Sequence, residues 1–191
     1  LSGSKMWITN SPISDIGIIW AKTEAGIRGF IVERDFDGVS TPEIKHKLSL
    51  RASVTGEFVM DDVFVPDENL LPGSTKGLSA PLLCLTQARF GIAFGAMGAA
   101  MACFDIVRDY VLERKQFNKP IGSFQLVQAE LAEMFTEITK AQCLNYQLGR
   151  LKEINQLSHV MVSMGKRNSC YHALDITRRC RNLLGANGVS L

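Results

Sequence analysis

The chain has 191 residues, of which 46% are apolar and 21% are charged, and its formal net charge at pH 7 is +2. These values are ordinary for a soluble globular protein of one large or two small domains, and they exclude a chain too short to bury a core. The five cysteines are odd in number and include no C-x-x-C pair. We therefore expect reduced thiols, and no metal site, because the three histidines also lie far apart.

The longest weakly polar run is Phe90–Phe104, which is 15 residues long. A membrane span needs about 20 residues, so we expect a buried helix and no membrane span. The chain opens neither with Met nor with the pattern of a signal peptide. We expect the natural N-terminus to lie upstream.

The first 65 residues have the pattern of short strands rich in β-branched and aromatic side chains. The turn residues T-E-A-G, ending at Gly26, predict a hairpin, and Asp61-Asp62 predicts a bend or bulge. Regular strand spacing predicts a small antiparallel barrel or sandwich. The candidate strands are Trp7–Thr9, Ile16–Lys22, Ile27–Glu33 and Gly56–Pro66.

The strand Trp7–Thr9 ends at Asn10–Pro12 and has two interpretations. In the first, Trp7 is a core residue and Thr9 is a solvated strand residue. In the second, the indole packs on a flat heteroaromatic ligand and the hydroxyl bonds to its edge. The residues alone favour the first interpretation and leave the second open.

The period becomes helical after Pro66–Gly77, a stretch with two prolines and two glycines. Gly91, Gly95 and Gly98 share roughly one helix face and predict close approach by another backbone or a ligand, for which close helix packing is the simpler explanation. Ser123 is a candidate N-cap for the second helix, and the third ends at G-A-N-G. The expected helices run over about Pro81–Arg114, from Ser123 to a connection at Glu153–Ser158, and over His159–Leu184.

The predicted fold class is therefore α+β, with a small antiparallel β domain over residues 1–75 and an incomplete antiparallel helical bundle over residues 76–191. We expect a fourth helix to complete the bundle. Residues 1–75 carry 7 Lys and Arg against 11 Asp and Glu, whereas residues 76–191 carry 14 against 8. The basic half suits an anionic ligand such as a nucleotide, although solvated helix faces explain the charge equally simply.

Five segments in this order resemble the acyl-CoA dehydrogenase family. They are KMWITN, LSLRASVTGEFVMDDVFVPDENLLPG, ARFGIAFGAMGAA, ERKQFNKPIGSFQLVQ and LLGANG. WITNSPISD, LGRLKE and MVSMGKRNSCYHALDITR look most like the glutaryl-CoA dehydrogenase branch. The resemblance covers essentially the whole chain, and it implies most of a middle β domain followed by roughly three helices of the C-terminal bundle.

The resemblance implies FAD as cofactor, with Trp7 beside the flavin and Thr9 bonded to its edge. Arg114 matches an arginine that meets the pyrophosphate, often of FAD bound mainly by a neighbouring subunit. From the residues alone, Arg114 is an ordinary helix-end arginine and G-A-N-G a plain helix end. The implied cofactor-binding residues are Trp7, Ile8, Thr9, Arg114, Phe117, Gln125, Asn182, Leu183, Leu184, Gly185 and Ala186. Asn182 and Ala186 depart from the usual glutamine and glycine.

The start of the first long helix matches the family's acyl-CoA-binding stretch. The implied substrate-binding residues are Leu82, Leu83, Cys84, Leu85, Thr86, Gln87, Ala88 and Arg89. Some branches place the catalytic glutamate just before the helix arginine, where this chain has Ala88. We therefore assign no catalytic residue here and expect the glutamate beyond residue 191, so that the 191 residues alone lack activity. Glu113 and Glu130 are interpreted as solvated helix charges.

The implied whole enzyme oxidises and decarboxylates glutaryl-CoA to crotonyl-CoA, in lysine and tryptophan degradation, and passes electrons to electron-transferring flavoprotein. The resemblance also implies a homo-oligomer, a homotetramer in the family, in the mitochondrial matrix or the bacterial cytoplasm, without nucleic acid. The alternatives are another short-chain acyl-CoA dehydrogenase and a non-catalytic assembly or binding module with the same fold.

Overall fold

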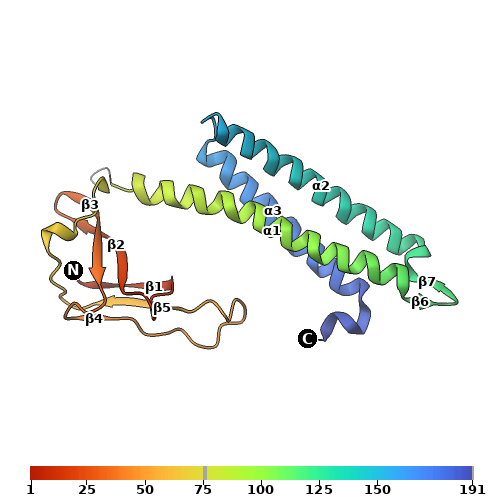
Figure 1. Ribbon diagram of the computed structural model, residues 1–191, viewed down its shortest axis with the longest axis horizontal. Coiled ribbons are helices and arrows are strands. Elements are labelled where there is room, and N and C mark those ends of the chain that lie inside the picture. Colours follow the sequence, from red (N-terminus) through yellow and green to blue (C-terminus); the bar gives the residue numbers. More distant parts are fainter. Residues whose placement is uncertain (75–76, 191) are drawn as a thin grey trace. The chain divides into compact units, whose positions relative to one another are not determined.

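The computed structural model describes residues 1–74 and 77–190, which form two compact units, Leu1–Leu82 and Leu83–Leu191 (Figure 1). The predicted boundary between residues 75 and 76 lies outside the described residues. Each unit has its own buried apolar cluster.

The first unit contains two open antiparallel sheets. One has the strand order β1-β5-β4, and the other is the β2–β3 hairpin, whose two-residue turn follows Thr23 as T-E-A-G predicted. The strands are β1 Gly3–Thr9, β2 Ile16–Thr23, β3 Gly26–Glu33, β4 Val39–Ser40 and β5 Thr55–Met60, with a short 3₁₀ helix η1 at Asp67–Asn69. The α+β class and the antiparallel strands are confirmed, but these described strands do not close into a barrel.

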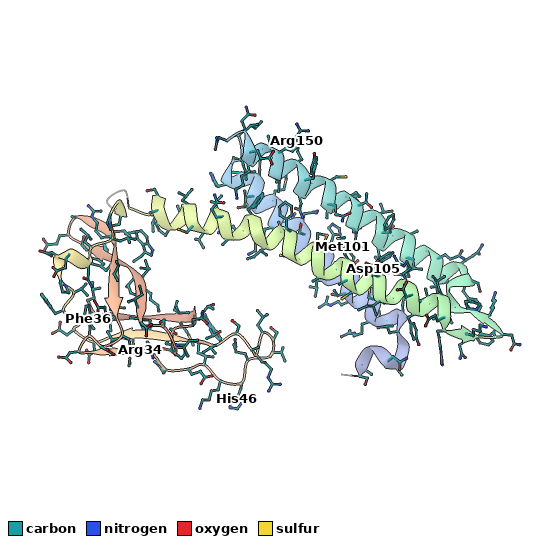
Figure 2. All side chains as sticks on the ribbon, viewed as in Figure 1. Arg34, Phe36, His46, Met101, Asp105 and Arg150 are labelled. Carbon is teal, nitrogen blue, oxygen red and sulfur yellow. The ribbon has the colours of Figure 1, made fainter. Side chains whose placement is uncertain are left out.

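Both sheets contribute to one core. Ile19 and Val32 come from the hairpin, and Phe58 and Met60 come from β5. Phe36, which follows β3, packs against this cluster and lies near Arg34 (Figure 2). The predicted bend at Asp61-Asp62 is present and ends β5, with Asp62 at φ 52°.

The second unit is built on three long helices, α1 Ser79–Glu113, α2 Gln125–Glu153 and α3 His159–Leu183. Their core includes Met97, Val107, Ile138, Ile176 and Cys180, so all three helices share one apolar interior. Burial, with a smaller contribution from nearby Cys103, raises the pKa of the Cys180 thiol to about 11. The shorter elements are β6 Lys115–Gln116, β7 Lys119–Pro120, η3 Ile121–Ser123 and η4 Gly185–Val189.

Two expectations for the helices are wrong. Ser123 is not the N-cap of α2, because it ends η3 and its Oγ donates to the Pro120 carbonyl at 2.7 Å, while Phe124 holds the cap position. The glycines of α1 do not pack closely against another helix, because a Cβ built on Gly91, Gly95 or Gly98 would meet no described atom within 4 Å, and the approach of a ligand to this face stays a prediction. By contrast, Ser158 caps α3 by accepting from the Met161 amide at 3.3 Å.

Helix α1 was expected to be buried, and it is so along one face only. Ala93, Met97, Ala100 and Phe104 lie in the core, whereas Ile106 is 62% exposed. The helix has 35 residues and is long and apolar enough to cross a membrane by length and composition, and 22% of its most apolar stretch is buried. The absence of a membrane span stays a prediction.

Candidate functional site

The end of β1 carries an irregularity that exposes its tryptophan. Lys5 pairs with Phe58 and Ile8 with Gly56, so β1 has one residue more than β5 between these pairs. Such a bulge redirects the side chains of the longer strand. Trp7 has φ 63°, a conformation unusual for a bulky residue, and its side chain is 62% exposed. Trp7 is therefore not a core residue of this unit.

Ile8 and Thr9, which follow the bulge, line a cavity of about 350 Å³. Its wall is mainly apolar and comes from β2 and Phe58. Gly17 lies directly over the Phe58 ring, which a Cβ there would approach to 2.6 Å. Thr9 is exposed, and its hydroxyl makes no hydrogen bond within the part of the chain that the structure describes. The cavity therefore has an apolar wall, and the Thr9 hydroxyl at its edge is available to bond to a ligand.

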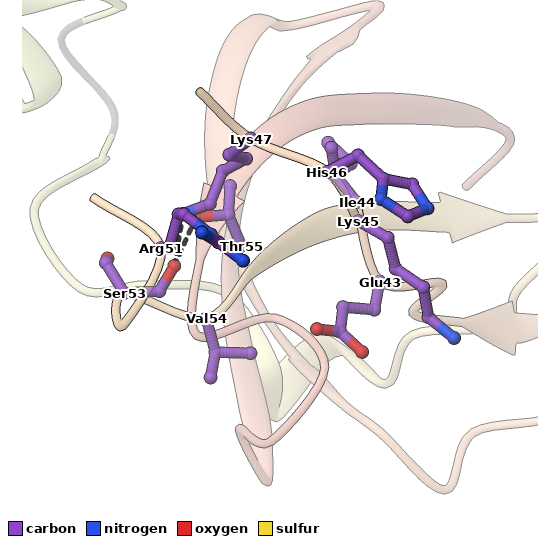
Figure 3. A pocket seen from close by; sticks show the side chains of 9 residues that line it. All are labelled: Glu43, Ile44, Lys45, His46, Lys47, Arg51, Ser53, Val54 and Thr55. Carbon is purple, nitrogen blue, oxygen red and sulfur yellow. Dashed lines mark hydrogen bonds between the residues drawn. The ribbon is translucent and has the colours of Figure 1, made fainter. Parts of the chain in front are cut away.

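A basic loop supports the strand opposite Thr9. Lys47 Nζ donates to Thr55 Oγ1 at 2.8 Å and to the Ser53 carbonyl (Figure 3). It also donates to the Leu50 carbonyl at 2.8 Å. Thr55 is the register partner of Thr9. The surrounding hollow, about 270 Å³, contains no residue predicted to be in the site and is lined by Glu43, Ile44, Lys45, His46, Lys47, Arg51, Ser53, Val54 and Thr55. Lys47 thus has a structural role, because its ammonium group joins three parts of this loop by hydrogen bonds.

A third cavity, of about 340 Å³, brings together residues roughly 70 positions apart in the sequence. Arg114, directly after α1, lines it together with Leu183, Leu184, Gly185 and Ala186 after α3. Within residues 1–74 and 77–190, no carboxylate or other side chain pairs with the Arg114 guanidinium. The cavity therefore offers an exposed guanidinium, a group suited to an anionic ligand.

The glycine at this helix end has a conformational role. Gly185 has φ 58°, which favours glycine, and it follows the C-cap residue Leu184. Ala186 lines the cavity, whereas Asn182 is exposed and does not. Tyr110, Gln116, Ile121 and Asn187 also line it and were not predicted. Asn187 Nδ2 lies 3.2 Å from the Tyr110 hydroxyl, so the second half of G-A-N-G ties η4 to α1.

Phe117 sits at the tip of a hairpin that the sequence pattern did not predict. Lys115 pairs with Pro120 and Gln116 with Lys119, which leaves Phe117 and Asn118 as a two-residue turn. Both have positive φ, 51° and 61°, as in a type I′ turn, and Phe117 is 86% exposed. Gln125 is the exposed first residue of α2. Neither Phe117 nor Gln125 lines the Arg114 cavity.

The predicted substrate stretch, Leu82–Arg89, occupies the first turns of α1. Leu82, Leu83 and Leu85 are 50%, 63% and 46% exposed, so they are not core residues here. Cys84, Gln87 and Ala88 are also exposed, and Thr86 and Arg89 are half-buried. Glu113 is the last residue of α1, and Glu130 lies 3.4 Å from Arg179, so both are accounted for as helix charges.

Comparison with known proteins assigns both units to one family. Residues 1–63 match the family described as "Acyl-CoA dehydrogenase, middle domain", and residues 75–191 match "Acyl-CoA dehydrogenase, C-terminal domain". The chain is 40% identical over 155 residues to the mitochondrial 2-methylacyl-CoA dehydrogenase of Solanum tuberosum, which covers 78% of this chain and 38% of that protein.

Two solved structures are similar over the whole chain. A crystal structure of glutaryl-CoA dehydrogenase from Mycobacterium smegmatis is 49% identical with a TM-score of 0.96, and the match covers 100% of this chain and 49% of that one. A glutaryl-CoA dehydrogenase from the same organism in complex with FADH2 is 46% identical, with the same TM-score and the same coverage. The chain thus spans about half the length of each of these two structures. By these matches, and by the fold of both units, the chain belongs to the acyl-CoA dehydrogenase family.

Proposed function

We propose that this chain is part of an FAD-dependent acyl-CoA dehydrogenase most like glutaryl-CoA dehydrogenase. The observation that carries the proposal is the meeting of Arg114 with Leu183–Ala186 around one cavity, at positions where the family resemblance implies FAD. The similarity to glutaryl-CoA dehydrogenase structures supports the substrate, and the neighbour that holds FADH2 supports the cofactor.

The residues of the Arg114 cavity suit the diphosphate part of FAD. A guanidinium can donate two parallel hydrogen bonds to phosphate oxygens, and charge-assisted bonds of this kind are stronger than neutral ones. Gly185 lets backbone amides approach a ligand without an intervening side chain. In this proposal Arg114 and Gly185 contact the diphosphate, and Arg114, Phe117 and Gln125 serve FAD bound mainly by a second subunit.

The residues at the end of β1 suit the flavin ring. Trp7 presents an exposed aromatic face, and Thr9 presents an exposed hydroxyl above an apolar wall. When bound, FAD supplies the acceptor for the hydride that leaves the β-carbon of the acyl thioester. A donor aimed at the flavin edge stabilises the charge that develops there, and in this proposal Thr9 is that donor.

The remaining parts of the proposal rest on the family. Leu82–Arg89 holds the acyl-CoA, residues 1–75 and 76–191 act as two domains, and the catalytic glutamate lies outside these 191 residues, since Ala88 has no titratable group. The whole enzyme would convert glutaryl-CoA to crotonyl-CoA and carbon dioxide, reduce electron-transferring flavoprotein, and work as a homo-oligomer in a mitochondrial matrix or bacterial cytoplasm.

Anaerobic titration of the whole FAD-loaded protein tests the function. Glutaryl-CoA is expected to bleach the oxidised flavin band, with crotonyl-CoA and carbon dioxide as products. Bleaching by 2-methylbutyryl-CoA but not by glutaryl-CoA would favour the activity named for the potato relative. A flavin that no acyl-CoA reduces would favour the non-catalytic module.

A further inference from the structure

Arg34 lies just after β3, and its side chain reaches the turn that ends β1. Its Nη2 donates to the Ser11 carbonyl at 2.9 Å and to Thr41 Oγ1 at 3.2 Å. The Arg34 amide donates to the Asp15 carbonyl at 2.8 Å. The same residue therefore holds both ends of the segment from Ser11 to Asp15.

Ser11 passes this restraint on to the strand end. Its side chain is buried, with 1% exposed, and its Oγ donates to the Ile8 carbonyl at 3.2 Å. That carbonyl belongs to the peptide that joins Ile8 to Thr9. The turn is also closed by the amides of Ile13 and Ser14, which donate to the Asn10 carbonyl at 2.9 and 2.8 Å. Arg34 thus holds the main chain of Ser11, and the Ser11 side chain in turn bonds to the Ile8–Thr9 peptide.

The setting of Arg34 favours a positioning role over an ion pair. No Asp or Glu among residues 1–74 and 77–190 forms a salt bridge with it. Its Nε is buried and has no hydrogen-bond partner within that same part of the chain. Leaving a buried N–H without a partner costs free energy, and the two hydrogen bonds of Nη2 offset part of that cost. What they hold here is the turn behind Thr9.

We propose that Arg34 is a positioning residue for the flavin-facing end of β1, fixing the Thr9 hydroxyl through Ser11 and the Ile8 carbonyl. The inference rests on the proposed function for the identity of the ligand as flavin. The hydrogen bonds that it uses all lie within the first unit. Because Trp7 and Asn10 both have positive φ, 63° and 64°, this strand end departs from regular strand geometry. It therefore depends on outside restraints of the kind that Arg34 supplies.

The test uses the whole FAD-loaded protein and the variants Arg34→Met, Arg34→Lys and Thr41→Val. Met keeps an unbranched stem without donors, Lys keeps a charged donor on a shorter reach, and Val removes only the Thr41 acceptor. Arg28→Met is the control, because among the described residues Arg28 Nη1 donates to the neighbouring Ile27 carbonyl alone. The readouts are hydrogen–deuterium exchange of the peptide spanning Trp7–Ser14, the flavin absorption spectrum and the FAD dissociation constant.

Arg34→Met is expected to speed exchange in that peptide roughly tenfold to hundredfold, the range for losing a charge-assisted bond. It should also shift the flavin spectrum and weaken FAD binding. Thr41→Val and Arg34→Lys should change the same quantities less, and Arg28→Met should match wild type. Wild-type exchange and spectra in both Arg34→Met and Thr41→Val would overturn the positioning role of Arg34 and leave the proposed function intact. A wild-type protein that binds no FAD would overturn the proposed function as well, and if Arg34→Met does not fold, Thr41→Val and Arg34→Lys decide.

Discussion

At the residue scale, the opening strand shows what the sequence can and cannot predict. W-I-T at a strand end was recognisable from β-branched and aromatic residues. The exposure of Trp7 was not, because it comes from a bulge that exists only through pairing with β5. In the same way, the meeting of Arg114 with Gly185 could not follow from spacing, since a packed bundle is needed to bring the two together. The family resemblance named both residues, but it gave no geometry.

Thr9→Val keeps the branched shape and removes the hydroxyl. Because that hydroxyl has no partner within the described residues, stability should hardly change, whereas flavin reduction by substrate should slow by up to about tenfold, as expected for one hydrogen bond of roughly 0.5–1.5 kcal/mol. Stopped-flow reduction of the whole enzyme and its flavin potential measure the effect. Wild-type rate and potential would make the hydroxyl a bystander.

Trp7→Ala should separate stability from cofactor binding. With 62% of the side chain exposed, the free energy of unfolding of the protein without FAD should change by about 0.5 kcal/mol or less, as for most surface positions. FAD affinity should nevertheless fall, because the indole is the large apolar surface offered to the flavin. Thermal unfolding of the apoprotein and FAD titration measure the two quantities. A large loss of apoprotein stability with unchanged affinity would return Trp7 to a packing role.

At the element scale, the long helices were predictable and the short connections were not. The pattern placed the third helix at His159–Leu184, and α3 is His159–Leu183. The β6–β7 hairpin was missed because its turn, Phe117-Asn118, lacks the glycine that usually marks a type I′ turn. Ser123 is not the cap that the sequence predicted, because Ile121–Ser123 form the 3₁₀ turn η3 before α2 begins.

A buried polar contact joins the three helices. Asn145 Nδ2 donates to the Ala93 carbonyl of α1 at 3.0 Å and to Ser169 Oγ of α3 at 3.2 Å. Asn145→Ala leaves the Ser169 hydroxyl buried without this partner, so unfolding should become easier by about 1–3 kcal/mol. Denaturant unfolding of the whole protein measures this. Ser163→Ala is the control, because the Ser163 hydroxyl donates to the His159 carbonyl of α3 and to no other described residue. Equal stability of Asn145→Ala and Ser163→Ala would contradict the role.

The Glu137 carboxyl should make the stability of the helical bundle depend on pH. A hydrogen bond from Lys140, with weaker attraction from His172, Lys140 and Arg179, outweighs desolvation and lowers the pKa of the Glu137 carboxyl. A lowered pKa stabilises the fold above the ordinary carboxyl value, and this is lost as pH falls through the folded-state pKa. Glu137→Gln should therefore lower Tm slightly at pH 7, by the equivalent of at most about 1 kcal/mol. The difference should shrink as the pH falls below the ordinary carboxyl value and through the folded-state pKa, and an equal difference at pH 7 and in acid would exclude the linkage.

At the scale of the whole molecule, the α+β class and the order of strands before helices follow from the change of hydrophobic period near residue 77. The expected barrel is not formed by the described strands. The sequence could not show this, because strand pairing across the sheets depends on contacts far apart in sequence. The extent of α1 exposure was also missed, since periodicity shows where an apolar face lies but not what covers it.

The central claim is that residues of this chain hold FAD, and Arg114→Ala in the whole protein tests it most directly. Loss of a charge-assisted bond of about 1.5–3 kcal/mol should weaken FAD binding roughly tenfold to hundredfold. The matched control is Arg178→Ala, an exposed arginine of α3 that does not line the Arg114 cavity. The measurement is the FAD dissociation constant by fluorescence titration of apoprotein. Weaker binding in Arg114→Ala alone is the predicted result, and equal, wild-type affinity in both variants would contradict it.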